Sequence, residues 1–396
     1  MTHKPNIPCR LCRNENVSTC LHLPRAPRTV ERLLRRDQLV GDQACPLDIA
    51  VCPFCGFVQL TSYLGDEFYA DYEMGCSFSP NYHHYLATLS MDFLAHFDLN
   101  GKKLLEVGCG DGAFLDKFSS AGIEVTGIEP SKPFRDAAQA RGHYVLDMYL
   151  GPDSLPPGAP YDAVVTRQVL EHIFDVDGFL RGLNNCLTPG GVLLVEVPNL
   201  ALAMSQSRFY DFFPDHVNYF NAATLSAALF AYGFDVVSVA PTMAGEFVTA
   251  HARKIAPPPD NPIIEPTEQP PVFAAMTAGM EALIARLRAL DVDCIAGGKK
   301  LAVWGSGGKG VAALAAADLE GIDYVVDADP RKQGLFMPAS HHQVQPPEHL
   351  RQFPPDVIVL TALAHRAEIL NTLQNEYGFQ GIVVALGETL DSNLFS

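Results

Sequence analysis

The stretch KKLLEVGCGDGAFLDKFSSAGIEVTGIEPS, residues 102–131, decides the fold. Its apolar run at Lys103–Val107 predicts a strand, and apolar residues at helical spacing over 113–121 predict a helix. A glycine-rich turn at 108–112 joins the two, and a second predicted strand ends at the acid Glu129. This order of strand, turn, helix and strand predicts a parallel α/β sheet with a binding site at the carboxyl ends of its strands.

The glycine-rich turn and its acid suit a bound ligand. Gly108, Gly110 and Gly112 let the backbone pass close to a bound molecule. An acid about 20 residues after the turn can bind both hydroxyls of a ribose. A lone turn of this kind also serves plain packing of a helix on a strand, so its surroundings decide. They supply three further predicted strands, one of them in YDAVVTRQVLEHI at 161–173.

The motif EVGCGDG and the strands around it resemble the class I S-adenosylmethionine-dependent methyltransferases over about residues 95–255. The resemblance implies a Rossmann-like core that binds S-adenosylmethionine. It implies that the glycines approach the methionine and ribose, that Glu129 binds the ribose, and that Asp147 lies near the adenine. The predicted cofactor-binding residues are Glu106, Gly108, Gly110, Gly112, Glu129 and Asp147.

Two CxxC motifs precede this core, one in CRLC at 9–12 and one in CPFC at 52–55. Each motif brings two thiolates to one side of a tight turn, and two motifs complete a tetrahedral four-sulfur shell suited to zinc. A complete shell leaves no position for a substrate, so the zinc is expected to be structural. Cys20 or Cys45 could replace one ligand, and reduced, unligated thiols are the alternative interpretation. The predicted zinc ligands are Cys9, Cys12, Cys52 and Cys55.

An acid and an imidazole, Asp215 and His216, stand among aromatic residues in FFPDHVNYF at 212–220. Asn221 can cap a following helix, so His216 is expected on a loop at the acceptor side of the core. Methyl transfer needs an acceptor held in line and a proton removed from it. His216 is therefore a candidate general base that Asp215 orients. The alternative is that both residues tie the loop to backbone groups. His172, in VLEHI, is a second candidate that can equally shape the pocket.

The chain changes character after the core. Residues 256–272 hold seven prolines and predict an extended linker. Residues 273–290 have the spacing of an amphipathic helix. The segment VWGSGGKG at 303–310 then fits a glycine-rich GxGxxG turn, and Asp327 ends the next predicted strand. These residues alone suggest a nicotinamide cofactor, with a tight packing turn as the alternative.

The whole chain resembles the sugar C-methyltransferases of antibiotic deoxysugar pathways, which methylate a nucleotide-linked keto-sugar. The resemblance rests on CRLC, CPFCGF, EVGCGDG, VLEHI, DHVNYF, VWGSGGKG and VVDADPRKQG. It implies that His216 is the histidine that abstracts the proton beside the ketone, with Asp215 in place of a glutamate. It further implies that His172 is the second active-site histidine, and that Tyr72 is a catalytic tyrosine after the zinc lobe.

The sequence also departs from the family motif at Phe213, where the family has a tyrosine, and at Pro214, where the family has the first histidine. A phenyl ring cannot donate a hydrogen bond to an enolate. Either a neighbour such as Tyr72, Tyr210 or Tyr219 supplies the hydroxyl, or the acceptor is not the usual keto-sugar. The resemblance also implies a C-terminal lobe that holds no redox cofactor and faces the acceptor. The predicted substrate-binding residues are Phe213 and Tyr219, with Lys309 and Lys332 as candidates for the substrate's diphosphate.

We therefore expect an α/β protein in four segments. These are a zinc-binding lobe at 1–70, a methyltransferase core at 71–255, a proline-rich linker and helix at 256–298, and a Rossmann-like domain at 299–396. The expected reaction is C-methylation of a nucleotide-linked keto-deoxysugar or a similar carbonyl-bearing metabolite. The alternatives are O- or N-methylation of a small-molecule natural product, and a non-catalytic zinc and Rossmann binding protein.

Composition narrows the possible partners. The 396 residues carry a formal net charge of −17, which argues against a broad surface for a nucleic acid polymer. No apolar run approaches the length of a membrane span, and the start MTHKPNIPCRLC lacks the apolar core of a signal peptide. We expect a cytoplasmic protein, monomeric or homodimeric, whose partner is a small molecule.

Overall fold

A computed structural model describes residues 7–30, 32–62, 80–267 and 269–387. The chain divides into two compact units, each built from segments that are not contiguous in sequence. The first comprises Met1–Cys20, Ile49–Leu202 and Asp215–Pro271, and the second comprises Leu21–Asp48, Ala203–Pro214 and Val272–Ser396. This division into two units does not test the four consecutive segments expected from the sequence, which remain a prediction.

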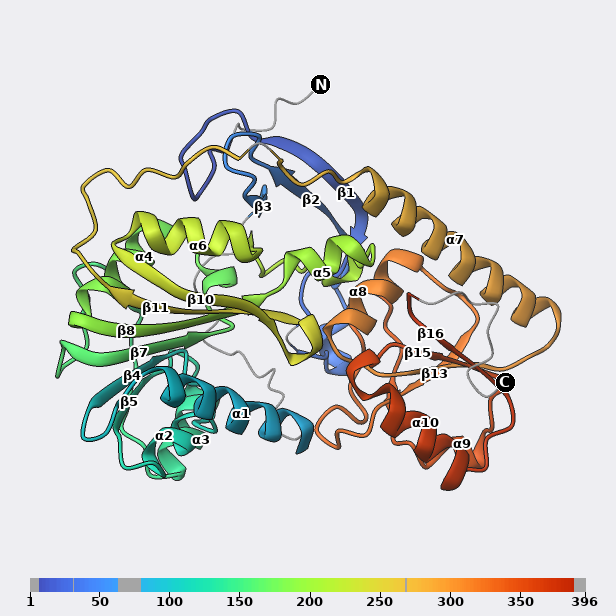
Figure 1. Ribbon diagram of the computed structural model, residues 1–396. Helices are drawn as coiled ribbons and strands as arrows, with labels where there is room; N and C mark the ends of the chain where they lie inside the picture. Colours follow the sequence, from blue (N-terminus) through green and yellow to red (C-terminus); the bar gives the residue numbers. More distant parts are fainter. Residues whose placement is uncertain (1–6, 31, 63–79, 268, 388–396) are drawn as a thin grey trace. The chain divides into compact units, whose positions relative to one another are not determined.

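The first unit is organised by a sheet that, among the described residues, has seven strands (Figure 1). Its five strands β8 to β6 run parallel, and β11 and β10 extend it antiparallel. In sheet order the strands are β10 Phe234–Thr242, β11 Phe247–Lys254, β8 Leu187–Pro198, β7 Tyr161–Arg167, β4 Lys103–Val107, β5 Glu124–Ile128 and β6 Val145–Leu146.

Helices cover both faces of this sheet, because its central strands are apolar on both sides (Figure 1). On one face, Leu104 and Leu194 pack with Phe93 of α1 and Phe118 of α2. On the other face, the neighbouring strand residues pack with α4 and α6. The helices of this unit are α1 Pro80–His96, α2 Leu115–Ser119, α3 Lys132–Ala140, α4 Val176–Asn185 and α6 Ala222–Ala231, and α5 Leu200–Ser205 lies at its boundary.

A smaller sheet brings the N-terminal cysteines close to the loop at 215–219. Its strands, in sheet order, are β1 Ser18–Ala26, β2 Cys45–Val51, β3 Val58–Leu60 and β9 Asn218–Tyr219. Strand β3 pairs antiparallel with β2 and, on its other side, with β9, where Val58 lies opposite Tyr219. The chain segment that holds Cys52 and Cys55 is thus joined by backbone hydrogen bonds to the strand that follows His216.

The second unit contains a parallel sheet with helices α7 Ala274–Ala296, α8 Gly308–Ala317, α9 His349–Gln352 and α10 Arg366–Asn375 (Figure 1). Helix α10 packs on the sheet through Leu373, which shares a core with Ile358 and Val383. In sheet order the strands are β14 Val344–Gln345, β13 Ile322–Val326, β12 Leu301–Trp304, β15 Val357–Leu360 and β16 Ile382–Ala385.

Most of the predicted elements form at the predicted positions. The strand at Lys103–Val107 is confirmed, and the helix after it is shorter than predicted because turns occupy the residues up to Phe114. The helix predicted at 273–290 runs on to Ala296 and ends where Gly297 and Gly298 follow, the latter with φ 60°. Helix α6 begins after Asn221, whose side chain accepts from the N–H of Thr224 at 2.9 Å, as predicted.

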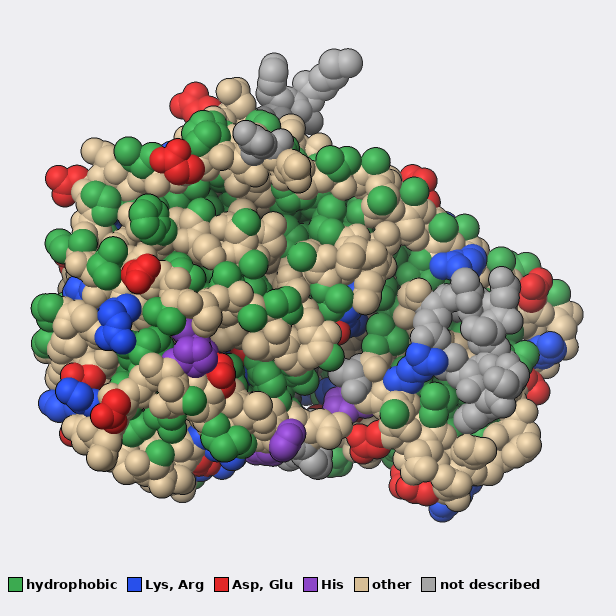
Figure 2. All heavy atoms as spheres, in the orientation of Figure 1, with side chains coloured by type: hydrophobic (Ala, Val, Ile, Leu, Met, Phe, Trp, Pro, Cys, Tyr) green, Lys and Arg blue, Asp and Glu red, His purple; other side chains and the backbone are tan. Residues whose placement is uncertain are grey.

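Charged side chains of both signs lie on the face shown in Figure 2. On the face shown in Figure 2, acidic and basic side chains are interspersed, and no extended single-sign patch covers the described part of that face. Across the described ranges, no helix combines the length and the hydropathy needed to cross a bilayer.

Candidate functional site

The glycine-rich turn lies at the carboxyl end of β4, as predicted. Gly108, Gly110 and Gly112 all have positive φ, between 53° and 80°, which favours glycine. A Cβ on Gly108 would lie 2.3 Å from the side chain of Val169, so the turn packs closely against the segment that follows β7. A Cβ on Gly110 would meet nothing within 4 Å, so this side of the turn is open.

Glu129 lies beside this open side. One of its carboxylate oxygens accepts from the N–H of Gly110 and the other from the N–H of Ser131, both at 2.8 Å. Burial raises the pKa of Glu129, and the two backbone hydrogen bonds oppose that shift. Each carboxylate oxygen can accept a further hydrogen bond, so the carboxylate still has acceptor capacity for ribose hydroxyls.

Glu106, in β4 just before the turn, has a carboxyl oxygen that is suited to accept a hydrogen bond from a ligand. Its side chain is buried, and its Oε2 atom has no hydrogen-bond partner within the described chain. Burial raises its pKa to about 8. A buried carboxyl oxygen without a partner is costly unless a donor arrives, such as an ammonium or hydroxyl group. The methionine ammonium and ribose hydroxyls of S-adenosylmethionine are donors of this kind, so the residues present fit that cofactor.

Asp147, the sixth predicted cofactor residue, is more exposed than the others. It directly follows β6, and its carboxylate pairs with Arg135 of α3 at 2.9 Å, with 67% of its side chain exposed. It lies after the third strand at the same edge of the sheet as Glu129.

The predicted catalytic histidines lie together at this edge. His172 ends a short 3₁₀ helix, Leu170–His172, that follows β7. Its ring centroid lies 4.6 Å from that of His216, and the two rings meet edge to face. The Nδ1 atom of His172 lies 3.2 Å from both the carbonyl oxygen and a carboxylate oxygen of Asp215. That carboxylate oxygen is 3.9 Å from Nε2 of His216, so Asp215 binds His172 more closely than its sequence neighbour.

This arrangement shifts the pKa values of the two imidazoles in opposite directions. Burial lowers the pKa of His216 to about 3, and the nearby Asp215 only partly offsets it. Burial also acts to lower the pKa of His172, but its hydrogen bond to Asp215 and the charges of Glu171 and Asp215 outweigh that effect and raise it. Burial raises the pKa of the adjoining Glu171 to about 7. His172 therefore holds the proton more readily, and His216 stays neutral.

Two residues that the sequence analysis missed hold the loop at 215–219 in place. The side chain of Asn218 donates to the carbonyl oxygens of Leu170 and Ile173, at 3.0 and 2.6 Å, on either side of His172. The guanidinium of Arg10, inside the first CxxC motif, donates to the carbonyl oxygen of Val217 at 2.8 Å. No pattern of spacing marks either residue.

A second missed feature is a buried charge network at the carboxyl end of β7. Arg167 ends that strand and pairs with Glu196 of β8 at 3.0 Å, with both side chains almost fully buried. The phenol of Tyr85, in α1, donates to the same carboxylate, and Arg167 donates to the Tyr82 hydroxyl at 3.0 Å. The parallel pairing of β7 with β8 places Arg167 opposite Glu196, so a register of the two predicted strands could have identified this pair.

The four predicted zinc ligands converge. The sulfurs of Cys9 and Cys55, and those of Cys12 and Cys52, lie 3.6 Å apart, and all four lie within 4.8 Å of one another. Tetrahedral zinc with bonds of about 2.3 Å would hold sulfurs about 3.8 Å apart, so the cluster fits zinc. Cys20 is elsewhere, with its thiol 3.4 Å from the carbonyl oxygen of Ile49, and it does not belong to the cluster.

The remaining predicted residues are spread over the chain. Tyr219 is buried in β9, with its ring centroid 6.4 Å from that of His216. Tyr72 lies outside the described residues. In the second unit, the ring of Phe213 lies against Gly308, Lys309 pairs with Asp211 at 3.4 Å, and Lys332 pairs with Asp327 at 3.2 Å.

The second glycine-rich turn is hydrogen-bonded to Asp327, the acid at the end of the next strand. It follows β12 and leads into α8, as predicted. The Asp327 carboxylate accepts from both the N–H and the hydroxyl of Ser306, at 2.9 and 2.7 Å. This acid thus lies where a ribose-binding acid would be, and Ser306 and Lys332 already occupy part of its acceptor capacity.

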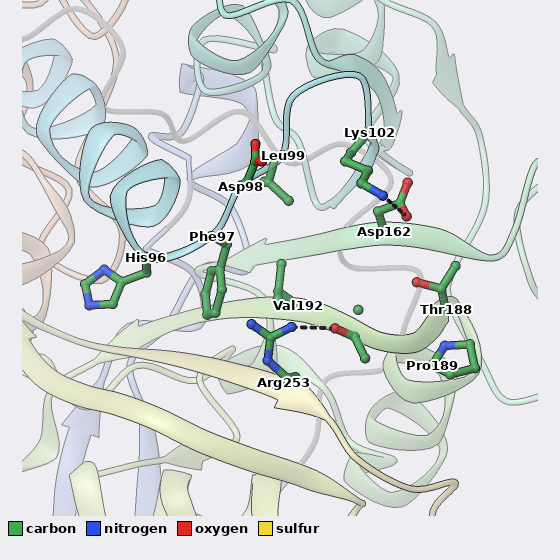
Figure 3. A pocket seen from close by; sticks show the side chains of 12 residues that line it. His96, Phe97, Asp98, Leu99, Lys102, Asp162, Thr188, Pro189, Val192 and Arg253 are labelled. Carbon is green, nitrogen blue, oxygen red and sulfur yellow. Dashed lines mark hydrogen bonds and ion pairs between the residues drawn. The ribbon is translucent and has the colours of Figure 1, made fainter.

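A cavity of about 260 Å³ lies at the other edge of the large sheet (Figure 3). Lys102 and Asp162 pair across it at 3.7 Å, and Arg253 donates to the carbonyl oxygen of Gly190 at 2.9 Å. Because Lys102 and Asp162 lie at the amino ends of β4 and β7, this cavity is separate from the cluster around the glycine-rich turn.

Three family models match successive parts of the chain. Residues 9–67 match the model described as "Putative zinc binding domain". Residues 81–239 match a model described as a methyltransferase domain, and residues 266–386 match one described as a C-methyltransferase C-terminal domain. The four sulfurs lie in the first of these segments, and the glycine-rich turn and both histidines lie in the second.

Individual proteins resemble this chain either over nearly its whole length or over part of it. The C-methyltransferase NovU of Streptomyces niveus is 26% identical over 387 residues, 93% of this chain and 92% of that protein. A ubiquinone biosynthesis O-methyltransferase of Caulobacter vibrioides is 35% identical, but over 30% of this chain and 49% of that protein. The structure of magnesium protoporphyrin IX methyltransferase from Synechocystis PCC 6803 with bound SAH is 18% identical, with a TM-score of 0.37, over 48% of this chain and 91% of that chain. The similarity to the C-methyltransferase is the one of these three that spans all three matched segments.

Proposed function

Because the chain is an S-adenosylmethionine-dependent C-methyltransferase with a class I core, a zinc-binding lobe and a C-terminal α/β domain, we propose that His216 is its general base. The proposed acceptor is a nucleotide-linked keto-deoxysugar or a similar carbonyl-bearing metabolite, methylated at the carbon beside the carbonyl. S-adenosylmethionine supplies the methyl group. The observation that carries the proposal is the pair of histidines, His172 and His216, whose ring centroids lie 4.6 Å apart and whose side chains are 11% and 13% exposed.

A carbon beside a ketone becomes a nucleophile only when its proton leaves. His216 suits that step because burial keeps its imidazole neutral, the form that accepts a proton. Its low pKa belongs to the protein without an acceptor. When the proton leaves carbon, an enolate forms next to the imidazolium, and this opposite charge favours the protonated ring.

The enolate oxygen needs a hydrogen-bond donor, and we propose that His172 supplies it. Asp215 raises the pKa of His172 and so favours its protonated form, which donates through both ring nitrogens. The Nδ1 atom lies 3.2 Å from Asp215, and in this proposal Nε2 is the nitrogen that donates to the enolate oxygen. This arrangement would replace the family tyrosine, whose position Phe213 occupies here.

The acceptor's diphosphate has candidate ligands in the second unit. We propose Lys309, at the first turn of α8, and Lys332 for this role. Each lysine pairs with an aspartate, so a bound diphosphate would compete with Asp211 and Asp327 for them. Phe213 and Tyr219 would flank the sugar, and Tyr72 remains a proposed catalytic residue.

Proton exchange tests the proposal directly. In D₂O with a nucleotide-linked 4-keto-deoxysugar and no S-adenosylmethionine, the wild type should wash deuterium into the carbon beside the ketone, and His216→Ala should not. In turnover, His216→Ala should lower kcat by about 10²–10⁴, the usual contribution of general acid–base catalysis.

The control is His84→Ala, which removes an exposed histidine of α1 and should leave both exchange and turnover unchanged. Equal exchange in wild type and His216→Ala would contradict the role of His216. Methyl transfer to oxygen or nitrogen of a small molecule, without exchange at carbon, would support the alternative reaction class instead.

A further inference from the structure

A second cluster of metal-ligating side chains lies in the first unit, outside the site described above. Asp92 and His96 belong to the last turns of α1, and His251 belongs to β11. A carboxylate oxygen of Asp92 and one ring nitrogen of each histidine lie within 4.8 Å of one another. None of the three is among the predicted zinc, cofactor or catalytic residues.

Local structure brings the three side chains together. Asp92 and His96 are four residues apart, so they share one face of α1. His251 projects from β11 toward that helix, with its ring centroid 4.9 Å from that of His96 and 5.4 Å from that of Phe93. Figure 3 shows His96 at the end of α1, on the rim of the cavity.

Among the three residues, His251 gives the strongest evidence for a bound ligand. Its side chain is 4% exposed, and both of its ring nitrogens lack a hydrogen-bond partner among the described residues. The nearest carboxylate oxygen, of Asp92, is 3.8 Å from Nε2, beyond hydrogen-bonding distance. Native proteins rarely leave a buried polar group unpaired, so a partner for this nitrogen is expected.

The protonation states fit a metal ligand. Burial lowers the pKa of His251, and the nearby Asp92 acts in the opposite direction. The Nδ1 atom of His96 lies 2.8 Å from the carbonyl oxygen of Asp92, the distance at which Nδ1–H donates. That bond leaves the lone pair on Nε2 of His96, and such carbonyl–histidine pairs commonly orient metal ligands.

We propose that Asp92, His96 and His251 bind one divalent transition-metal cation of the zinc type. Two imidazoles and one carboxylate are a donor set that suits Zn²⁺, Co²⁺ or Ni²⁺. Asp92 and His96 are 55% and 37% exposed, so water completes the coordination. The cation joins the C-terminal end of α1 to β11 and stabilises the packing of that helix on the sheet.

The test uses the full-length protein with its cysteine cluster loaded with zinc, titrated with ZnCl₂ by calorimetry and followed by thermal melting. Wild type should bind one further equivalent, and this binding should raise Tm. Asp92→Asn and His96→Gln, both at exposed positions, should each weaken this binding at least tenfold, and His251→Gln should abolish it. Because the first two variants leave the core intact, the proposal stays testable even where His251→Gln fails to fold.

Two controls separate this site from others. His84→Gln, at an exposed position of the same helix, should bind the added zinc as wild type does. His216→Ala should also bind it, since Glu171, His172 and His216 form another group that could attract zinc. The proposal is overturned when wild type takes up no further equivalent, when Asp92→Asn and His96→Gln bind it undiminished, or when His216→Ala loses it.

Discussion

At the scale of single residues, the candidate site contains a carboxyl group with an unpaired oxygen and two imidazoles with shifted pKa values. Glu106 has an unpaired carboxyl oxygen, burial lowers the pKa of His216, and Asp215 and Glu171 raise that of His172 against the effect of burial. A buried carboxyl oxygen without a hydrogen-bond partner is unfavourable in a core that only has to pack. These groups make the carboxyl edge of β4 and β7 the place where ligand and proton chemistry are expected.

The first prediction concerns Glu129. Hydrogen bonds to a charged group are worth about 1.5–3 kcal/mol, so Glu129→Ala should weaken S-adenosylmethionine binding by about that amount. Glu129→Gln, which keeps the size of the side chain, should show a smaller loss in the same direction. Glu124→Ala, at the exposed start of β5, is the control. Calorimetric titration with S-adenosylmethionine measures all three, and an unchanged Kd in both Glu129 variants would remove this residue from the site.

The second prediction concerns pH. If His172 must be protonated to hold the enolate, activity should fall as the pH rises through its pKa, which lies above the ordinary value of 6.5. His216 must be neutral to accept a proton. Because its pKa is about 3, the loss of activity from protonating it falls below the usual assay range of pH. The profile of kcat/KM between pH 5 and 9 should therefore show an alkaline limb, and His172→Gln should lower the rate and remove that limb. A limb that persists in His172→Gln belongs to another group.

At the scale of elements, strands and caps were predictable where a periodic pattern met a clear stop signal. The strand before Gly108 and the helix capped by Asn221 are examples, because each boundary is set by a local residue. The pairing of β3 with β9 was not predictable, because it joins short segments far apart in sequence. For the same reason Arg10 and Asn218 were missed, since their bonds to backbone carbonyls become visible only once the chain is folded.

The third prediction concerns the first turn of α8. If Lys309 binds the diphosphate, Lys309→Ala should raise the acceptor's KM more than it lowers kcat, because that contact is present in both the ground state and the transition state. Lys300→Ala, at an exposed lysine just before β12, is the matched control. Steady-state kinetics with the nucleotide-linked acceptor measures both. A lower kcat at unchanged KM would place Lys309 in the chemical step and not in phosphate binding.

At the scale of the whole molecule, hydrogen bonds link the four-cysteine cluster to the loop at 215–219 within the first unit. Arg10 lies between two of the four cysteines and binds the carbonyl oxygen next to His216, and its guanidinium also binds the carbonyl oxygen of Leu60. The four cysteines, β3 and the loop at 215–219 therefore form one connected structure. With His216 as the proposed general base, we expect this link to let a structural zinc affect catalysis without taking part in the chemistry.

The fourth prediction follows from this link. Cys52→Ser should lower the zinc content, and it should lower kcat at least tenfold, since misplacing a catalytic group by about 1 Å can cost about 10²-fold. S-adenosylmethionine affinity should change little, because the glycine-rich turn is held by β4 and β5. Arg10→Gln should keep its zinc and still lose kcat, and Cys20→Ser, outside the cluster, should behave as wild type. Full activity in a zinc-free chain would contradict the link, as measured by elemental analysis alongside turnover.

The pairing of β3 with β9 also sets an order of events during synthesis. Val58 leaves the ribosome long before Tyr219, its partner in the small sheet. At roughly 5–20 residues per second, the nascent N-terminal segment waits on the order of ten seconds for that strand. During this interval β3 presents an unpaired edge to other nascent chains. Early binding of zinc by the four cysteines would keep the segment around β3 folded until its partner strand β9 emerges.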